Sequence, residues 1–329
     1  MATTRALVVG CGSIGRRHLR NLHALGYGTL WATDPDPAAR ALAAEESGAT
    51  PMGSLEEALA TGPSLVLVCT PPHLHVPFAR RAIAAGADVF IEKPIDVAVT
   101  PDLDALLGEA DAAGRIVACG YNLRCHAGLR AVKAAVDAGQ VGRVYTIDIE
   151  FGFYLPDWRP GVDYRANYGA RREQGGGILL DASHEVDYLR WLGGDVASVH
   201  AVLQKSSDLE MDVEDTAWLT CRMVSGVLAQ VRLDCLQRRY SRRCKVVGSE
   251  ATVEWSWQDG VVRWVPGAEA QPLAAVPDPN LMYLDELRDL MEAVTTRRAP
   301  VSTGRDARAS LAVIDAARLS SADRREVHL

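Results

Sequence analysis

The sequence of 329 residues is 48% hydrophobic and 23% charged, a balance typical of a folded protein that is long enough for two domains. Its formal net charge of −7 gives no electrostatic reason to expect nucleic acid or an anionic membrane as a partner, because both attract basic surfaces. We expect no leader and no membrane span, since the start lacks a basic segment and no apolar run is long enough. The seven cysteines are odd in number and include no Cys-x-x-Cys pair, which favours a reducing cytoplasm.

Short apolar runs alternate with Ala-rich helical segments through the first 120 residues, a pattern typical of a parallel sheet covered by helices. The predicted strands are Ala6–Val9, Thr29–Thr33, Leu65–Cys69, Asp88–Ile91 and Ile116–Cys119. The predicted helices between them are Ile14–Leu25, Pro37–Glu46, Leu55–Ala60, Val76–Ala85 and Pro101–Ala113. The alternation predicts an α/β, doubly wound nucleotide-binding domain over residues 1–122.

A glycine-rich turn joins the first predicted strand to the first predicted helix. It contains Gly10, Gly12, Ser13, Ile14 and Gly15, so it has the context as well as the spacing of a dinucleotide fingerprint. The first glycine permits the tight turn, the second allows backbone N–H groups to approach a pyrophosphate, and the third allows close packing of the helix. A glycine-rich turn without a ligand is the alternative.

Asp34 ends the second predicted strand, where a carboxylate can accept hydrogen bonds from the adenosine ribose hydroxyls and repel a 2′-phosphate. This position favours NAD over NADP as the cofactor. The alternatives are that Asp34 is a turn or N-cap residue before Pro35, and that Arg16 or Arg17 holds a 2′-phosphate.

The chain changes character after residue 122, where we predict a second domain, α+β, over residues 123–329. The predicted helices are Gly128–Ala138, Ile178–Leu192, Leu281–Thr296 and Arg305–Leu319. Alternating polarity predicts antiparallel strands with one covered face at Arg143–Phe151, Ala217–Met223, Val227–Cys235, Cys244–Val247 and Thr252–Trp257. The stretch Asp157–Gly177 lacks apolar periodicity and is predicted to be a long loop or lid, a kind of segment that is commonly functional.

A family resemblance rests on motifs spread over nearly the whole chain. They are Cys69–His75, Ala84–Gly86, Glu92–Pro94, Gly120–Arg124, Gly175–Gly177, His184–Asp187 and Tyr283–Leu287. Together these motifs resemble the Gfo/Idh/MocA family, the glucose-fructose oxidoreductase and inositol dehydrogenase group. The resemblance implies a Rossmann domain, a second domain with a large open, mostly antiparallel sheet, and homodimers or homotetramers that pair through that sheet.

The resemblance also implies roles for individual residues. Thr70, Pro71, Pro72 and His75 would lie along the nicotinamide, and Glu92 and Pro94 would flank a lysine, Lys93, placed at the substrate hydroxyl. Segment 157–172 looks like that of members acting on sugars in glycan or secondary-metabolite biosynthesis.

Hydride transfer at an alcohol needs a group that takes or returns the hydroxyl proton, and Lys93 and His184 are the candidates. Asp181 precedes His184 by three positions and would orient the imidazole, whereas the commonest family pattern has a spacing of four, where this chain has Leu180. The alternatives are a surface lysine paired with Glu92 and a core histidine bonded to a backbone carbonyl.

Further polar and aromatic residues are candidates for contacts to a polyhydroxylated ring. They are Tyr121, Asn122, Arg124, Tyr154, Trp158, Arg159, Arg165 and Arg172, with His184. Each of them is as easily explained as a core, interface or surface residue. His73 and His75 lack acidic or thiol partners at ligand spacing, so no metal site is expected.

The preferred hypothesis is an NAD-dependent dehydrogenase or ketoreductase that acts on a sugar, an aminosugar or a cyclitol. A second hypothesis is a glycosidase or epimerase that oxidises its substrate transiently on tightly held NAD. A third is a protein that senses NAD without turnover; Lys93 and His184 argue against it.

Overall fold

The computed structural model describes residues 4–159, 161–166 and 168–329 and divides into two compact units. The N-terminal unit contains Met1–Asn122 and Asn280–Arg308, and the C-terminal unit contains Leu123–Pro279 and Ala309–Leu329. The N-terminal unit therefore includes a second segment that is distant in sequence from the first.

The N-terminal unit is built on a six-stranded parallel sheet with the order β3-β2-β1-β4-β5-β6. Its strands are β1 (Arg5–Val9), β2 (Thr29–Thr33), β3 (Thr50–Met52), β4 (Leu65–Val68), β5 (Asp88–Ile91) and β6 (Val117–Cys119). All residues of β4 and β5 are buried, which explains why their sequences are apolar without alternation. The order reverses between β1 and β4, and a sheet of this kind binds ligands at the carboxyl ends of its strands next to such a reversal.

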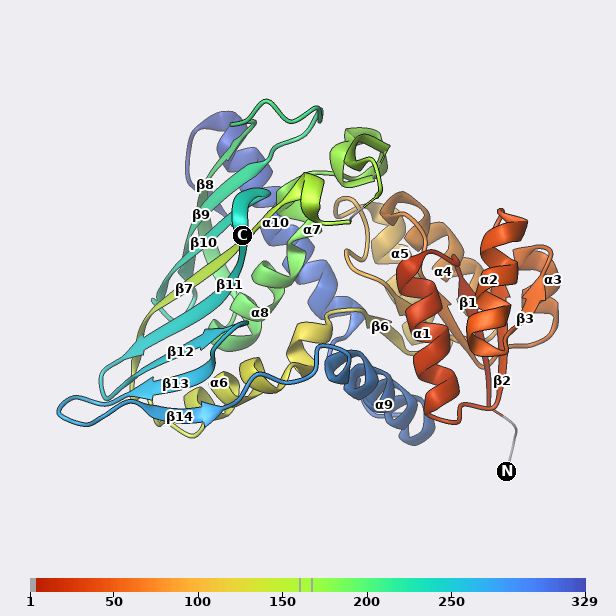
Figure 1. The fold of residues 1–329 in the computed structure, drawn as a ribbon, viewed down its shortest axis with the longest axis horizontal. Helices are drawn as coiled ribbons and strands as arrows, with labels where there is room; N and C mark the ends of the chain where they lie inside the picture. Colours follow the sequence, from red (N-terminus) through yellow and green to blue (C-terminus); the bar gives the residue numbers. More distant parts are fainter. Residues whose placement is uncertain (1–3, 160, 167) are drawn as a thin grey trace. The chain divides into compact units, whose positions relative to one another are not determined.

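Helices surround this sheet and confirm the predicted α/β, doubly wound fold. They are α1 (Ser13–Ala24), α2 (Pro37–Ser47), α3 (Leu55–Ala60), α4 (His75–Ala84), α5 (Pro101–Ala112) and α9 (Leu281–Thr296), with the 3₁₀ turn η1 (Pro72–Leu74). Helix α9 lies beside α1 (Figure 1), and Leu287 and Leu290 of α9 join the core that contains Leu19 and Leu22 of α1. This apolar contact explains why the late segment belongs to the first unit.

The C-terminal unit is built on a nine-stranded sheet with the order β14-β13-β12-β11-β7-β10-β9-β8-β15. Its strands are β7 (Val144–Tyr154), β8 (Val196–Gln204), β9 (Thr216–Met223), β10 (Leu228–Asp234), β11 (Leu236–Gly248), β12 (Thr252–Ser256), β13 (Gly260–Trp264), β14 (Gln271–Ala274) and β15 (Val327–His328). Strands β7 and β10 pair in parallel and the other neighbours are antiparallel. The expected mostly antiparallel sheet is thus confirmed.

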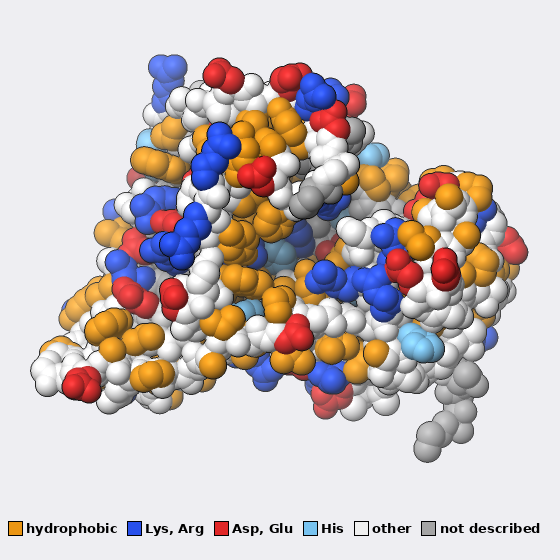
Figure 2. Space-filling view, in the orientation of Figure 1, with side chains coloured by type: hydrophobic (Ala, Val, Ile, Leu, Met, Phe, Trp, Pro, Cys, Tyr) orange, Lys and Arg blue, Asp and Glu red, His pale blue; other side chains and the backbone are white. Residues whose placement is uncertain are grey.

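Helices cover one face of this sheet. They are α6 (Ala127–Asp137), α7 (Ile178–Asp181), α8 (Ser183–Gly193) and the part of α10 (Gly304–Asp323) that belongs to this unit. Helix α6 packs on β12 to β14, and α8 packs on β7 and β10. Buried and exposed residues alternate along β9 and β10, so the opposite face is uncovered. Figure 2 shows basic side chains with acidic ones among them over the strands of this unit.

Two local predictions for the C-terminal unit are wrong. The predicted single helix over residues 178–192 is divided into α7 and α8, because Ala182 has φ −90° and ψ 29°, outside the helical region. Strand β11 begins at Leu236, whereas the prediction began at Cys244. The prediction missed the first half of the strand because its many arginines hide the alternation of buried and exposed residues. The predicted loop Asp157–Gly177 begins at the last residue of the 3₁₀ turn η3 (Leu155–Asp157) and contains η4 (Tyr164–Ala166), η5 (Tyr168–Ala170) and η6 (Arg172–Gln174). Residues 160 and 167 of that loop lie outside the described ranges.

Over the residues that the structure describes, no helix has both the length and the apolar character that crossing a lipid bilayer requires. The same residues contain no group of three or more His, Cys, Asp or Glu side chains arranged to hold a metal ion.

Candidate active site

The glycine turn follows β1 and leads into α1. Gly10 has φ +98°, a conformation that favours glycine, and a Cβ on Gly15 would lie 1.9 Å from the carbonyl oxygen of Gly10. Around Gly12, in contrast, an added Cβ would meet no described atom within 4 Å. Gly12 is also the N-cap of α1, and no described side chain caps the helix there. The first N–H groups of α1 are therefore open to an anion, as a bound pyrophosphate requires.

Asp34 lies beside this turn, directly after β2. Its Oδ2 accepts a hydrogen bond from the backbone N–H of Cys11 at 2.7 Å, and its Oδ1 accepts one from Asp36 at 2.9 Å. Each carboxylate oxygen can accept more than one hydrogen bond, so a ribose hydroxyl remains a possible further donor. The turn and the carboxylate together fit the phosphate and ribose of a dinucleotide.

The two arginines that we considered for a 2′-phosphate have other partners. The Nε of Arg16 lies 3.3 Å from Glu46, and its Nη1 donates to the carbonyl of Cys11 at 3.3 Å. The guanidinium of Arg17 lies over the ring of Tyr283, 4.5 Å from its centre. These contacts favour NAD over NADP as the cofactor beside Asp34, because both guanidinium groups already contact other residues of the chain instead of standing open to a 2′-phosphate.

His75 connects the segments that follow β4 and β5. It is buried at the start of α4, with Nε2 2.8 Å from the carbonyl oxygen of Thr70 and Nδ1 2.8 Å from that of Pro94. Burial lowers the pKa of His75 below its usual value, while the two carbonyl contacts oppose this. The imidazole thus links Thr70, the first of the predicted nicotinamide-side residues, to Pro94 of the Glu-Lys-Pro segment.

Glu92 and Lys93 directly follow β5 at the carboxyl end of the sheet. Glu92 is buried and Lys93 is half-buried, and the Lys93–Pro94 peptide bond is cis. Tyr121 and Asn122, which follow the neighbouring strand β6, are buried as well. Burial raises the pKa of Tyr283, whose hydroxyl contacts the side chain of Asn122. This edge of the sheet therefore gathers candidate residues from β4, β5 and β6.

His184 lies in the first turn of α8, in the C-terminal unit, and only 8% of its surface is exposed. Asp181 is the last residue of α7, so the two side chains project from different helices rather than from one continuous helical face. The role of Asp181 toward His184 stays a prediction.

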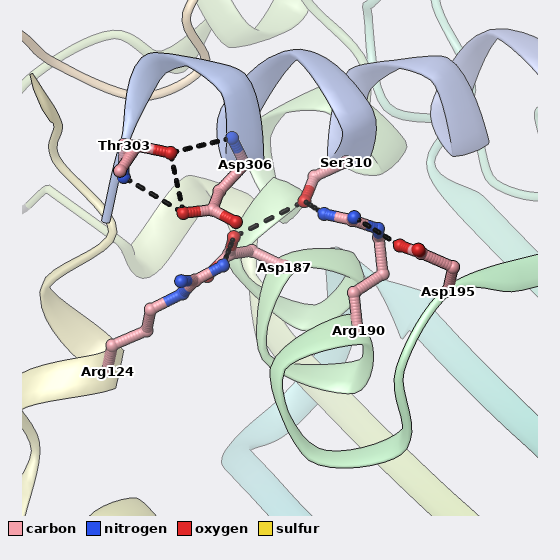
Figure 3. Close-up of polar contacts among 7 residues, drawn as sticks. All are labelled: Arg124, Asp187, Arg190, Asp195, Thr303, Asp306 and Ser310. Carbon is pink, nitrogen blue, oxygen red and sulfur yellow. Dashed lines mark hydrogen bonds and ion pairs between the residues drawn. The ribbon is translucent and has the colours of Figure 1, made fainter. Parts of the chain in front are cut away.

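Buried ion pairs hold the next residues of α8. Glu185 accepts hydrogen bonds from Nε of Arg242 at 2.7 Å and from Nη2 at 3.2 Å. Asp187 accepts two bonds of 2.8 Å from Arg124 and a longer contact of 3.3 Å from Ser310 (Figure 3). In a helix these carboxylates project on opposite sides of His184, so the pairs fix the rotation of the helix about its axis.

Arg124, predicted to bind substrate, thus has its guanidinium bound to Asp187. The other predicted arginines of the C-terminal unit lie in the loop. Arg165 pairs with Asp163 at 2.9 Å and with Glu210 at 3.4 Å, and Arg172 donates to the backbone of Asp212 at 2.7 Å. Arg159 is exposed.

An aromatic group near the end of β7 contains two of the predicted substrate residues. Trp158 is 45% exposed and stacks on Tyr240 at 5.9 Å with 8° between the ring planes. The guanidinium of Arg238 lies 3.6 Å from the ring centre of Tyr154. Tyr240 and Arg238 were not among the predicted residues, because the strand was predicted to begin only at Cys244 and the arginine-rich stretch before it shows no clear alternation of polarity.

The chain matches known proteins over both units. Residues 4–121 match the model of an oxidoreductase family with an NAD-binding Rossmann fold, and residues 129–254 match that of the GFO/IDH/MocA C-terminal domain. The myo-inositol dehydrogenase Hyg17 of Streptomyces leeuwenhoekii is 30% identical over 75% of this chain and 75% of its own length.

Two solved structures extend this likeness to the whole chain. GenD2 from gentamicin A biosynthesis, crystallised with NAD, has a TM-score of 0.86 at 28% identity and covers 100% of this chain and 97% of its own. The WlbA dehydrogenase of Bordetella pertussis, crystallised with NADH and UDP-GlcNAcA, has a TM-score of 0.83 at 26% identity and covers 99% of each chain.

Proposed function

Because the chain belongs to the Gfo/Idh/MocA family of NAD-binding oxidoreductases, we propose that it transfers a hydride between NAD and a secondary hydroxyl or ketone of a sugar, an aminosugar or a cyclitol. The observation that carries the proposal is the sheet edge of the N-terminal unit, where the glycine turn after β1 and Lys93 after β5 share one side. The names of the similar proteins, which mention inositol, gentamicin A biosynthesis and UDP-GlcNAcA, support this substrate class.

The residues that would hold NAD come from four strand ends. Gly10, Gly12, Ser13, Ile14 and Gly15 would bind the pyrophosphate at the start of α1. Asp34 would bind the adenosine ribose, and Thr70, Pro71, Pro72, His75 and Glu92 would line the nicotinamide side. When bound, NAD accepts or supplies the hydride; the chain contributes binding, orientation and the proton.

Lys93 and His184 would exchange the proton of the reacting hydroxyl, with Asp181 orienting the imidazole. Substrate hydroxyls would contact Tyr121 and Asn122 from the N-terminal unit. From the C-terminal unit we propose contacts with Arg124, Tyr154, Trp158, Arg159, Arg165 and Arg172. The exposed ring of Trp158 supports a contact with the apolar face of a sugar ring, whereas the ion pair of Arg124 leaves it a weaker candidate.

The proposal extends to assembly and location. Trp218, Val202, Trp264 and Leu228 are 60%, 51%, 48% and 44% exposed on the uncovered sheet face, which supports a homodimer or homotetramer that pairs there. Light scattering of the purified protein should give a molar mass that is a multiple of 35.5 kDa. The molar mass of Trp218→Glu should be that of the monomer. The cysteine pattern supports a cytoplasmic location.

The test of the function is an assay of NADH absorbance with a panel of cyclitols, hexoses, aminosugars and nucleotide sugars. Lys93→Ala should lower kcat at least about a hundredfold. Lys133→Ala, which removes a lysine paired with Asp137 on α6, should leave kcat unchanged. Wild-type protein that binds NADH yet turns over no member of the panel would contradict the proposal.

A further inference from the structure

A buried polar cluster in the N-terminal unit connects the first helix to the candidate lysine. His18 of α1 is fully buried, and its Nε2 lies 2.6 Å from Oε1 of Glu92. The second carboxylate oxygen of Glu92, Oε2, accepts a hydrogen bond from the backbone N–H of Lys93 at 3.1 Å. One carboxylate thus joins an imidazole to the peptide group of Lys93.

The contacts favour one tautomer of His18. Glu92 accepts on Oε2, and its side chain packs against Gly120, where an added Cβ would lie 3.0 Å from that oxygen. The Nδ1 of His18 has no hydrogen-bond partner among the described residues, so an imidazolium would bury an N–H without an acceptor. The tautomer with its proton on Nε2 donates to Oε1 of Glu92 and leaves no N–H at Nδ1, so it fits both observations.

Glu286 of α9 belongs to the same surroundings. It is 4% exposed, and neither of its carboxylate oxygens has a hydrogen-bond partner in the described part of the chain. Burial and the nearby Glu92 raise its pKa well above the usual value. Burial and the neighbouring carboxylate thus favour the protonated form of Glu286, whereas both oxygens of Glu92 have contacts, one with His18 and one with the backbone N–H of Lys93.

We propose that His18 is a positioning residue for Lys93: its Nε2–H fixes the carboxylate of Glu92, which in turn fixes the backbone N–H of Lys93. The ring of His18 is itself held by edge contacts with Phe90 at 5.2 Å and Tyr283 at 6.3 Å. The same helix begins at the glycine turn, so α1 serves both the pyrophosphate site and the orientation of Lys93.

Two substitutions separate the hydrogen bond from the packing. His18→Gln can place an amide N–H where Nε2 now lies, whereas His18→Leu fills similar space without a donor. We expect His18→Leu to release the Glu92 side chain and His18→Gln to retain its position. Leu22→Ala, on the same buried face of α1, is the matched control that destabilises the helix packing without touching Glu92.

The first readout is independent of any substrate. The sequence contains four lysines, so selective ¹⁵N-lysine labelling gives four backbone amide signals, and Lys93→Arg identifies that of Lys93. His18→Leu should move this signal upfield and speed its hydrogen exchange, because the amide loses its acceptor. His18→Gln should keep the wild-type exchange rate, and Leu22→Ala should leave the chemical shift unmoved. An unchanged Lys93 signal in a folded His18→Leu protein would overturn the inference.

The second readout is kinetic and rests on the proposed function. His18→Leu should lower kcat roughly ten- to a hundredfold, with the Kd for NADH within about twofold of the wild type, because a misplaced lysine affects reaction more than binding. His18→Gln should restore most of kcat. If kcat fell equally in His18→Gln and Leu22→Ala, the role of His18 would be packing alone, and the inference would be overturned. The amide experiment tests the inference even if no substrate is found. A failure of the inference can therefore be distinguished from a failure of the proposed function.

Discussion

Arg242 and Glu185 form a buried bidentate ion pair between β11 and α8, one residue beyond His184. The guanidinium also lies over the ring of Phe151, 4.0 Å from its centre, so it is enclosed by an aromatic face and a carboxylate. The pair is the link through which the long strand β11 holds the helix that carries the candidate histidine.

Removing one member of this pair should cost more than removing both. Arg242→Met leaves the carboxylate of Glu185 buried without its partner, and we expect a loss of about 3 to 5 kcal/mol in the free energy of unfolding. Arg242→Met combined with Glu185→Leu should recover most of that loss. Urea denaturation of both single variants and the double variant measures the coupling; additive losses would show that the pair contributes no interaction energy.

His126 should make the protein sensitive to acid. Its Nδ1 accepts the N–H of Gly128 at 3.1 Å, its ring packs on Trp255 and Trp257, and burial together with Arg242 lowers its pKa to about 4. The unfolded chain binds the proton near pH 6.5, so stability is intact above that pH and falls between pH 6.5 and pH 4. The loss from this group should be on the order of 3 kcal/mol.

The control for this pH dependence is His126→Asn, which keeps an N-cap acceptor for α6 but does not titrate. Denaturation at several pH values should give a flatter slope for the variant over that window. Parallel slopes would show that other groups cause the acid sensitivity.

Glu286 should act in the opposite direction. Its pKa is raised in the folded protein, so the unfolded chain releases the proton first as the pH rises, and stability contributed by this group declines above about pH 4.5. Glu286→Gln removes the titrating group. The free energy of unfolding of the variant should therefore equal that of the wild type near pH 4 and exceed it at pH 8. Asp285→Asn, on the neighbouring exposed position, is the control. A variant that is less stable at pH 8 would contradict a protonated Glu286.

Much of the N-terminal unit was predictable because its signals are local. Apolar runs such as those of β1 and β5 end at a glycine or at a charged residue, and the strands found there match the predicted ones closely. Strand β3 was missed, since it has only three residues and contains Pro51 at a sheet edge. Strand β14 was missed for a similar reason, as Pro272 interrupts it.

The candidate site was predictable only where residues follow strand ends. The sequence indicated Glu92 and Lys93, but it gave no sign that His18, 74 positions earlier, contacts Glu92. The burial of Glu286 likewise depends on α9 packing against α1, a contact between segments more than 250 positions apart. Hydrogen-bond partners of this kind depend on tertiary packing, which no short-range pattern specifies.

Asp34 should determine the choice of cofactor. Asp34→Ala removes a charged acceptor for the ribose and the acceptor of the Cys11 N–H, so the Kd for NADH should rise about ten- to a hundredfold. The ratio of the affinities for NADH and NADPH should also decrease, because the carboxylate no longer repels a 2′-phosphate. Asp36→Ala, which removes the N-cap of α2, should lower stability by about 1 kcal/mol and keep the preference. An unchanged preference for NADH over NADPH in Asp34→Ala would show that Asp34 only stabilises the turn and does not select the cofactor.

The two glycines of the turn should respond differently to alanine. Gly12 has φ −65°, and an added Cβ would meet open space. The free energy of unfolding of Gly12→Ala should therefore lie within about 0.5 kcal/mol of the wild-type value. The methyl group would occupy the side from which we expect the pyrophosphate to approach, so the Kd for NADH should rise at least about tenfold. In Gly15→Ala the Cβ would collide with the backbone of Gly10, and both stability and binding should fall. Thermal unfolding and NADH fluorescence of the two variants measure these effects, and equal NADH affinity of Gly12→Ala and wild type would exclude that side of α1 as the phosphate site.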